Sequence, residues 1–281
     1  MTTMAATLTL TRFRESDGLV LRALSAAACQ TGVVLEILFY DQSPSESLRA
    51  QAESLARDGL EVRVIQTPAA GLSAARNRAI GEAAHDIVLY LDADARPEPD
   101  WARRMIEAFA DPRVAVAGSR ILPEWTARPP RVAGSSIVLE QYSMLDMGSG
   151  QRSVPKVVGA GFGLHRGRLG HDAFFSAALG RRGGNLMGGE ETDLCARAIS
   201  AGHVVLYQGD AVILHLVEPE RLTYRWLVRR FFYAGRSRAA RSGAPAPFIR
   251  PGAGDVVLCL PLLPAYAAGL ALGRISGALK G

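Results

Sequence analysis

Cysteine is scarce in this sequence, and the three residues of this type, Cys29, Cys195 and Cys259, lie far apart. Such spacing fits neither a cluster of metal ligands nor a disulfide framework, which argues against a structural zinc module and a disulfide-stapled scaffold. Residues 1–14 lack the basic start and apolar core of a signal peptide. We therefore expect no secretory leader and a reducing, cytoplasmic location.

The sequence also lacks internal repeats and low-complexity tracts. Its 281 residues, 48% of them hydrophobic and 21% charged, are enough to bury a substantial core in one large domain or two small ones. We assign residues 1–243 to one folded domain. Residues 244–281 are interpreted as a proline-rich linker followed by an apolar tail.

Positive charge is concentrated late in the chain. The net charge is +5, and residues 221–241 carry a series of arginines: Arg221, Arg225, Arg229, Arg230, Arg236, Arg238 and Arg241. No nucleic-acid-binding motif accompanies them, so we expect no nucleic-acid partner. A solvated helix face and a contact with a membrane or with phosphate groups both remain open for this segment.

Strand-like and helix-like segments alternate in the first half of the chain. This alternation predicts an α/β fold with a mostly parallel sheet and helices on both of its faces. Ligands bind beyond the carboxyl ends of the strands in such sheets, and both Asp41 and Asp92 lie at strand ends. The predicted strands cover residues 7–11, 33–40, 61–65 and 87–91, and the helices residues 16–30, 46–57 and 72–84.

The second half is less regular. We predict helices over residues 101–110, 190–201 and 219–241, strands over residues 114–120, 157–164, 204–207 and 211–216, and an irregular stretch over residues 122–151. Residues 256–273 carry no charge but contain Pro261 and Pro264. Three interpretations of this tail remain open: a hairpin in or on a membrane, a single span, and a buried core helix.

Two carboxylates, Asp92 and Asp94, flank Ala93 directly after an apolar strand. Side chains one residue apart on an extended segment point the same way, so their charges repel unless a cation lies between them. Mg²⁺ and Mn²⁺ prefer oxygen ligands and often complete their shell with substrate phosphates. The pair therefore indicates a divalent cation site, although a turn or a helix cap would use the same residues.

A longer pattern surrounds this pair. Residues 71–101 read Gly-x-x-x-Ala-Arg-Asn on a predicted helix, then the apolar strand, Asp-x-Asp, two prolines and a tryptophan. This order of motifs resembles the core signature of the family 2 glycosyltransferases. Over roughly residues 5–240, the resemblance implies a GT-A fold, which is Rossmann-like, and a metal-dependent hexosyltransferase type of activity. It also implies a nucleotide-diphosphate sugar donor and inversion at the anomeric carbon.

The resemblance assigns donor contacts to three residues. Asp41 is expected to contact the base or ribose of the nucleotide, although an Asx-turn would use it equally well. Thr11 is expected to lie against the nucleotide, although residues 10–14 depart from the family's usual run at this point. Arg76 would pair with a phosphate or form a salt bridge on its own helix, and both possibilities remain open.

An acidic block, Glu190-Glu191, follows Gly188-Gly189 and opens a predicted helix. It resembles the family block whose second acid is the catalytic base, which assigns that role to Glu191, where Glu replaces the family's usual Asp. A carboxylate can remove the proton of an acceptor hydroxyl as it attacks the anomeric carbon. We expect Glu190 to contact substrate, and a capping role at the helix start is the alternative.

His215 ends a predicted strand beyond the acidic block. The resemblance places a histidine near here as a metal or diphosphate contact, so we expect His215 to be the third ligand beside Asp92 and Asp94. Residues 222–226 nearly match a motif of processive polysaccharide synthases, but the first position is Leu222 rather than Gln. We therefore expect single sugar transfer rather than polymerisation.

The sequence thus predicts transfer of a sugar from a nucleotide-diphosphate sugar to a hydroxyl acceptor, either lipid-linked or a cell-envelope glycan, at the inner face of the cell membrane. Residues 122–189 are expected to shape the acceptor site. Three alternatives remain: a non-catalytic nucleotide-sugar binding protein, a membrane-surface scaffold, and a nucleotidyltransferase. The last would require a glycine-rich loop with a basic residue, which residues 7–18 lack.

Overall fold

The structure is a computed structural model that describes residues 4–68, 70–181, 183, 185–240, 248 and 251–278. The segments predicted for the first half are all present, with ends that shift by up to four residues. Hydroxyl caps explain two helix starts, because Ser16 Oγ accepts from Leu19 N and Ser45 Oγ accepts from Leu48 N. The elements are β1 (Ala5–Arg12), α1 (Asp17–Ala28), β2 (Val34–Asp41), α2 (Glu46–Glu53), β3 (Leu60–Gln66), α3 (Leu72–Glu82) and β4 (Ile87–Asp92).

The second half adds short strands and helices to this frame. Its strands are β5 (Ala95–Pro97), β6 (Val114–Trp125), β7 (Gln151–Ser153), β8 (Gly161–His165) and β9 (Val204–Val217). Its α-helices are α4 (Trp101–Glu107), α5 (Ser136–Gln141), α6 (Arg166–Leu169), α7 (Glu190–Ser200), α8 (Tyr224–Ala239), α9 (Ala253–Cys259) and α10 (Leu263–Ala278).

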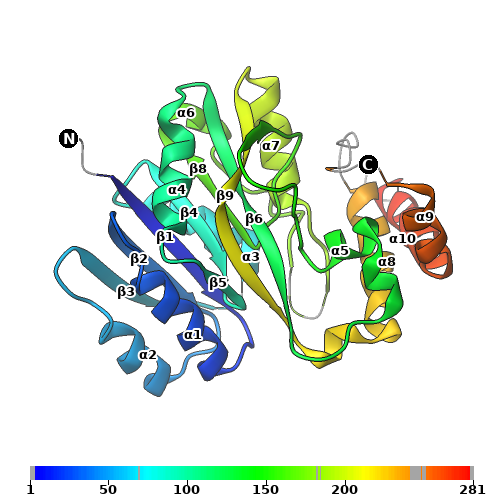
Figure 1. Cartoon of the computed structure of the whole chain (residues 1–281), viewed down its shortest axis with the longest axis horizontal. Coiled ribbons are helices and arrows are strands. Elements are labelled where there is room, and N and C mark those ends of the chain that lie inside the picture. The colour runs from blue at the N-terminus through cyan, green and yellow to red at the C-terminus, as the bar shows by residue number, and fades with distance from the viewer. Residues whose placement is uncertain are drawn as a thin grey trace.

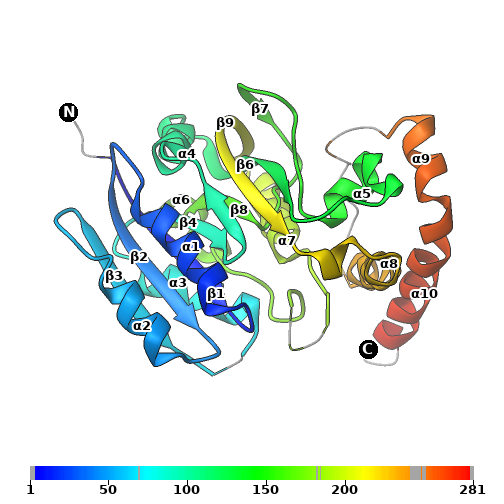
Figure 2. The same ribbon diagram turned by 60° about the horizontal axis from the view of Figure 1, so that its bottom comes forward.

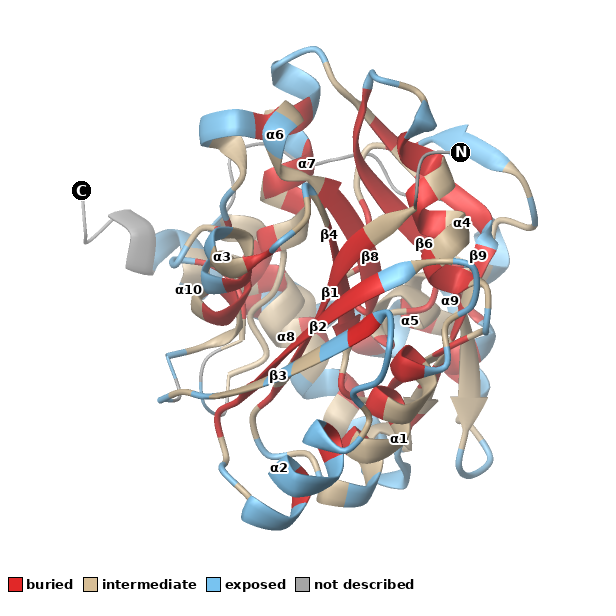
Figure 3. Cartoon of the chain, turned by 90° about the vertical axis from the view of Figure 1, so that its left-hand side faces the viewer, coloured by how far each residue is buried: buried red, intermediate tan, exposed pale blue. Residues whose placement is uncertain are grey.

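One mixed sheet organises the molecule (Figure 1). The strand order is β3-β2-β1-β4-β8-β6-β9-β5, with β7 paired to β9. The four strands from β3 to β4 are parallel, whereas β8 runs antiparallel to both β4 and β6. Helices α1, α2 and α4 lie on one side and α3, α6 and α7 on the other (Figure 3). The predicted α/β fold is confirmed, and the carboxyl ends of β1, β2 and β4 share one edge.

Strand β9 corrects one prediction. Residues 204–207 and 211–216 are both extended as predicted, but they belong to one strand and not to two. Its pairing with β6 jumps from Ser119 opposite Gln208 to Arg120 opposite Val212, so the intervening residues form a bulge. A Cβ on Gly209 would lie 2.3 Å from the carbonyl oxygen of Gly148, which explains why glycine occupies the bulge.

Three further boundaries differ from expectation. The helix predicted over residues 219–241 starts later, because residues 219–222 form a 3-10 turn. Helix α8 begins after Thr223, whose Oγ1 accepts a hydrogen bond from Trp226 N. The predicted helix end at residue 241 lies outside the described residues. Residues 122–151 are not wholly irregular, since they contain the end of β6 and all of α5. Strand β8 begins only at Gly161, after the loop that carries residues 157–160.

The tail forms α9 and α10, which lie with α5 and α8 at the end of the molecule opposite β3 (Figure 2). Helix α10 packs closely on α8, because a Cβ on Gly269 would lie 1.9 Å from the carbonyl oxygen of Phe232. Within the described residues, Ala253–Ile275 is long and apolar enough to cross a membrane, and 17% of its most apolar window is buried. A buried core helix is therefore the one interpretation of the tail that the structure contradicts.

Candidate active site

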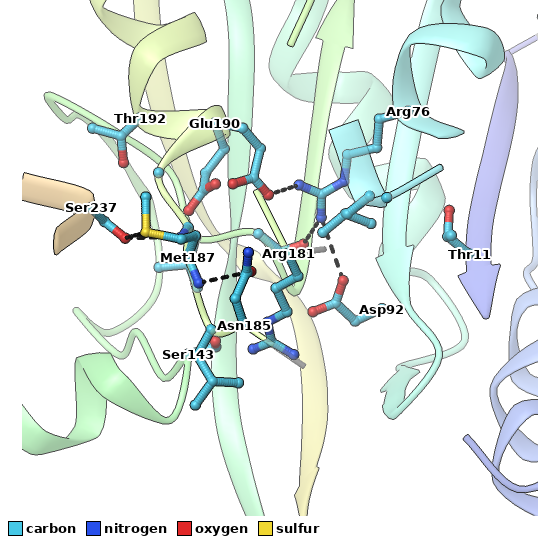
Figure 4. A pocket seen from close by; sticks show the side chains of 18 of the residues that line it. Thr11, Arg76, Asp92, Ser143, Arg181, Asn185, Met187, Glu190, Thr192 and Ser237 are labelled. Carbon is cyan, nitrogen blue, oxygen red and sulfur yellow. Dashed lines mark hydrogen bonds and ion pairs between the residues drawn. The ribbon is translucent and has the colours of Figure 1, made fainter. Parts of the chain in front are cut away.

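A pocket of about 370 Å³ opens at the carboxyl ends of β1 and β4 (Figure 4). Its walls come from distant parts of the chain: Thr11 on β1, Arg76 on α3, Asp92 on β4, the segment 185–192 at the start of α7, and Ser237 on α8. Parallel strands place their carboxyl ends at one edge of a sheet, which is where such folds bind ligands. The position of the pocket therefore agrees with the position that the sequence predicts.

Sheet pairing brings Asp92, Asp94 and His215 together. The antiparallel pair β5–β9 sets Ala95 opposite His215, so the residue before Ala95 reaches the same point. His215 Nε2 lies 3.1 Å from Asp94 Oδ1. The three residues offer ligand atoms that all lie within 4.8 Å of one another. Two carboxylates and an imidazole form a donor set that suits a divalent transition metal such as Mn²⁺.

The two aspartates differ in electrostatic environment. Burial raises the pKa of Asp92 above its ordinary value; the charge of Asp94 adds to this rise and Arg76 opposes it. Burial alone would also raise the pKa of Asp94, but His215 and Arg221 together hold it well below its ordinary value. Arg221 Nη2 lies 3.0 Å from Asp94 Oδ2. A divalent cation bound here would favour the ionised form of Asp92.

Arg76 links the aspartates to the acidic block. Its Nη1 donates to Glu190 Oε1 at 2.9 Å, and its Nη2 donates to Asp92 Oδ1 at 3.4 Å and to the carbonyl oxygen of Gly159 at 3.0 Å. The side chain is buried, and its guanidinium carbon lies 5.1 Å from the ring centroid of Phe162. The salt bridges of Arg76 therefore run to β4 and α7 and not along its own helix, as the sequence had allowed, and a phosphate contact stays a prediction.

Glu190 and Glu191 begin α7 directly after Gly189, which has a φ of 99°. Burial, followed by the nearby charge of Glu191, raises the pKa of Glu190 to about 7 although Arg76 opposes the rise. Its second carboxylate oxygen is buried without a hydrogen-bond partner among the described residues. Glu191 is less buried and lines the pocket. Gly159 lies beside this carboxylate, since a Cβ at that position would be 3.7 Å from Glu191 Cδ.

We expect Glu190→Gln to stabilise the metal-free protein more at high pH than at low pH. Because the pKa of Glu190 is about 7 in the folded chain against an ordinary value of 4.5, the folded state binds more protons between these values and loses stability as the pH rises. Gln cannot ionise, so its advantage grows across this window and is complete above it. Thermal unfolding at about pH 5 and about pH 8 would measure this difference. Glu53→Gln on the exposed face of α2 is the control, and equal shifts in Tm at both pH values would contradict the raised pKa.

The two remaining predicted nucleotide contacts, Thr11 and Asp41, differ in their position relative to the pocket. Thr11 lines the pocket and pairs in register with Asp92. Asp41 is buried, accepts from Ser43 N at 2.9 Å and lies 3.5 Å from Arg12 Nη1. This is the Asx-turn that the sequence left open, and among the described lining residues only its neighbour Gln42 reaches the pocket. Nucleotide contacts by Thr11 and Asp41 stay predictions.

Sequence reasoning missed several cations of the pocket. Lys156, Arg181 and Arg230 all line it. Arg230 Nη1 donates to the carbonyl oxygen of Leu186 at 2.8 Å, and burial, then the nearby Arg181, lowers its pKa to about 10. The late arginine run is therefore not simply a solvated helix face, because Arg221 and Arg230 point into the site. Arg230 lies on α8 and Arg221 in the turn before it, so only the orientation of this segment in the fold reveals their contacts.

Comparison with known proteins agrees with this geometry. The model of the family described as Glycosyl transferase family 2 matches residues 13–169, which is more than half of the chain. The chain belongs to glycosyltransferase family 2. The match covers both the Asp-x-Asp pair and the Arg76 helix, and it ends before the acidic block of α7.

Two curated relatives are similar to this chain over part of their length. A glucosyl-dolichyl phosphate glucuronosyltransferase of Haloferax volcanii is 26% identical over 171 residues, which are 60% of this chain and 55% of the relative. A pre-mycofactocin glycosyltransferase of Mycobacterium tuberculosis is 29% identical over 180 residues, which are 62% of this chain and 36% of the relative. The chain thus spans about half of the first relative and about a third of the second.

A solved structure shows the same fold. The mannosyltransferase of Pyrobaculum calidifontis, determined in complex with GDP-Man and Mn²⁺, superimposes with a TM-score of 0.63 at 19% identity. The match covers 98% of this chain and 75% of that one. The likeness confirms the predicted GT-A fold.

Proposed function

We propose that the protein transfers a sugar from a nucleotide-diphosphate sugar to an acceptor hydroxyl, with inversion at the anomeric carbon. One observation carries this proposal: Asp92 and Asp94, which cluster with His215, line the same pocket as Glu190 and Glu191 at the start of α7. A cluster of this kind can hold the donor diphosphate through a metal. The acidic block can then supply a base. A protein that only binds nucleotide sugars would need the metal-binding cluster but not the acidic block.

Asp92, Asp94 and His215 would hold Mn²⁺ or Mg²⁺, and the bound ion would act as a Lewis acid that neutralises the leaving diphosphate. Arg76 fixes Asp92 and Glu190 in the same network. Glu191 would accept the proton of the acceptor hydroxyl while that oxygen forms the new bond to the anomeric carbon. The bond from this carbon to the diphosphate breaks on the opposite face, so the configuration inverts.

A screen of nucleotide-diphosphate sugars tests the proposal. The full chain with Mn²⁺ or Mg²⁺ is incubated with each donor, with and without a lipid extract as acceptor, and release of nucleoside diphosphate is measured. We expect hydrolysis or transfer with at least one donor. Donor binding without any turnover would instead identify a binding protein, and the absence of both would overturn the proposal.

The acceptor is proposed to be lipid-linked, and the enzyme to work at the cytoplasmic face of a membrane. Residues 244–281 would then be the membrane-associating part, distinct from the catalytic domain over residues 1–243. Support comes from the relative whose name includes a dolichyl phosphate and from the apolar, mostly unburied helix Ala253–Ile275. Val257 and Leu260 on this segment are among its most exposed apolar residues.

Replacing Val257 and Leu260 together by Glu is expected to weaken binding to phospholipid vesicles. Burying one such side chain in an apolar phase contributes about 1.5–3 kcal/mol, so the loss should be at least about tenfold. Sedimentation with anionic vesicles measures it. Ile199→Glu, at an exposed residue of α7, is the matched control. Equal vesicle binding by the double variant and this control would contradict membrane association through the tail.

A further inference from the structure

A second cavity, of about 340 Å³, lies beside the reaction pocket. Its walls are mainly apolar and come from the end of β6 (Ile121, Leu122, Pro123), from α5 (Ile137, Leu139) and from Met144 and Leu145. Ligand sites in proteins typically span roughly 300–1,000 Å³. An apolar cavity of this size is therefore suited to an apolar ligand.

Backbone hydrogen bonds join two of the segments that line this cavity. Ile121 N donates to the carbonyl oxygen of Leu145 at 2.8 Å, and Leu145 N donates back to Ile121 at 3.1 Å. This bridge ties the segment after α5 to β6, so the two walls keep a fixed separation. The cavity is part of the folded frame rather than a gap between loosely packed elements.

The two cavities share a boundary. Glu140 and Phe248 line both of them. Lys156 sits at this boundary, where its ammonium group pairs with Glu140 and lies 4.6 Å from the ring centroid of Phe248. A ligand that extends across the boundary would pass from the pocket, whose lining includes Arg181 and Arg230, past the Lys156–Glu140 ion pair and into the apolar cavity. That sequence of environments matches an anionic head group followed by a hydrocarbon chain.

The apolar tail begins at the same cavity. Ser136, another lining residue, donates its backbone N–H to Asp255 Oδ1 at 2.6 Å, which ties the start of α9 to α5 (Figure 2). The exposed apolar side chains of α9 and α10 follow directly. A hydrocarbon chain that enters this cavity would therefore lie next to the part of the molecule with most affinity for lipid.

We infer that the cavity between β6 and α5 binds the hydrocarbon chain of an anionic, lipid-linked acceptor, with the head group near Lys156 and the reacting hydroxyl in the pocket. This inference rests on the proposed function and names its acceptor class. Each buried methylene group contributes about fourfold to affinity. Acceptors with longer chains should therefore bind more tightly until the cavity is filled.

Alkyl phosphates test the cavity without knowledge of the natural acceptor. Butyl, octyl and dodecyl phosphate are titrated into the full chain by calorimetry, below their micelle concentrations. For the wild type we expect Kd to fall steeply from butyl to octyl phosphate. Ile137→Trp, which fills the cavity, is expected to remove most of this dependence. Ile199→Trp makes the same change at an exposed site on α7 and is expected to keep it.

Two further measurements complete the test. Binding of a nucleoside diphosphate with Mn²⁺ reports whether each variant is folded, and Leu122→Asp on the opposite wall replaces Ile137→Trp if that variant does not fold. An unchanged dependence on chain length in a folded cavity variant would overturn the inference. So would a wild type that turns over donor but binds all three phosphates equally. Absence of any donor binding or turnover would instead overturn the proposed function, and this inference with it.

Discussion

The Glu191→Gln variant is expected to transfer sugar about a hundred to ten thousand times more slowly than the wild type, because a positioned general base contributes about this factor. An amide has nearly the shape of the carboxylate but cannot accept the acceptor proton. Glu191 lines the pocket at the first turn of α7, whereas Glu190 is committed to Arg76. Single-turnover rates at saturating donor would isolate the chemical step from donor binding.

Asp193→Asn is the matched control for this experiment. Asp193 lies on the same helix turn but pairs with Arg197, so its loss removes a negative charge without touching the pocket wall. We expect its transfer rate to stay close to that of the wild type. A folded Glu191→Gln that kept full activity would disprove the base assignment. If Glu190→Gln lost activity instead, the buried carboxyl with a pKa of about 7 would become the base.

The Asp94→Asn variant is expected to lose metal-dependent donor binding. The loss of Mn²⁺ affinity should exceed the roughly 10–100-fold that follows removal of an outer-shell partner, because Asp94 would itself be a ligand. Its carboxylate also lies close to both His215 and Arg221, whose side chains would be left without this partner. Calorimetric titration of Mn²⁺ in the presence of a nucleoside diphosphate measures the effect.

Controls separate metal loss from unfolding. Asp86→Asn changes an exposed aspartate that pairs with Arg166 near the amino end of β4, and its Mn²⁺ affinity should equal that of the wild type. Chelation of the metal from the wild type, followed by its return, should abolish and restore donor turnover. Mn²⁺-dependent turnover at the wild-type level in a folded Asp94→Asn would show that the cluster does not hold the metal.

Local pattern explains most of what could be predicted for the fold. Each strand and helix in the first half can be recognised from the periodic spacing of apolar residues within a short segment. Every element predicted there is present. The bulge in β9 was misinterpreted because Gln208-Gly209-Asp210 has the composition of a turn. Only the pairing with the distant strand β6, which resumes with Arg120 opposite Val212, shows that the strand continues.

The sequence by itself determined the family resemblance, the Asp92-Asp94 pair and the Glu190-Glu191 helix start, because each is a contiguous motif whose geometry follows from the local backbone. The tertiary structure decided which side chains meet. His215 reaches Asp94 through the pairing of β5 with β9, and Arg221 and Arg230 reach the pocket through the orientation of the segment that leads into α8. The apolar cavity required β6, α5 and the start of α9 to pack together. Such convergence depends on long-range pairing and packing, which no short stretch of sequence encodes.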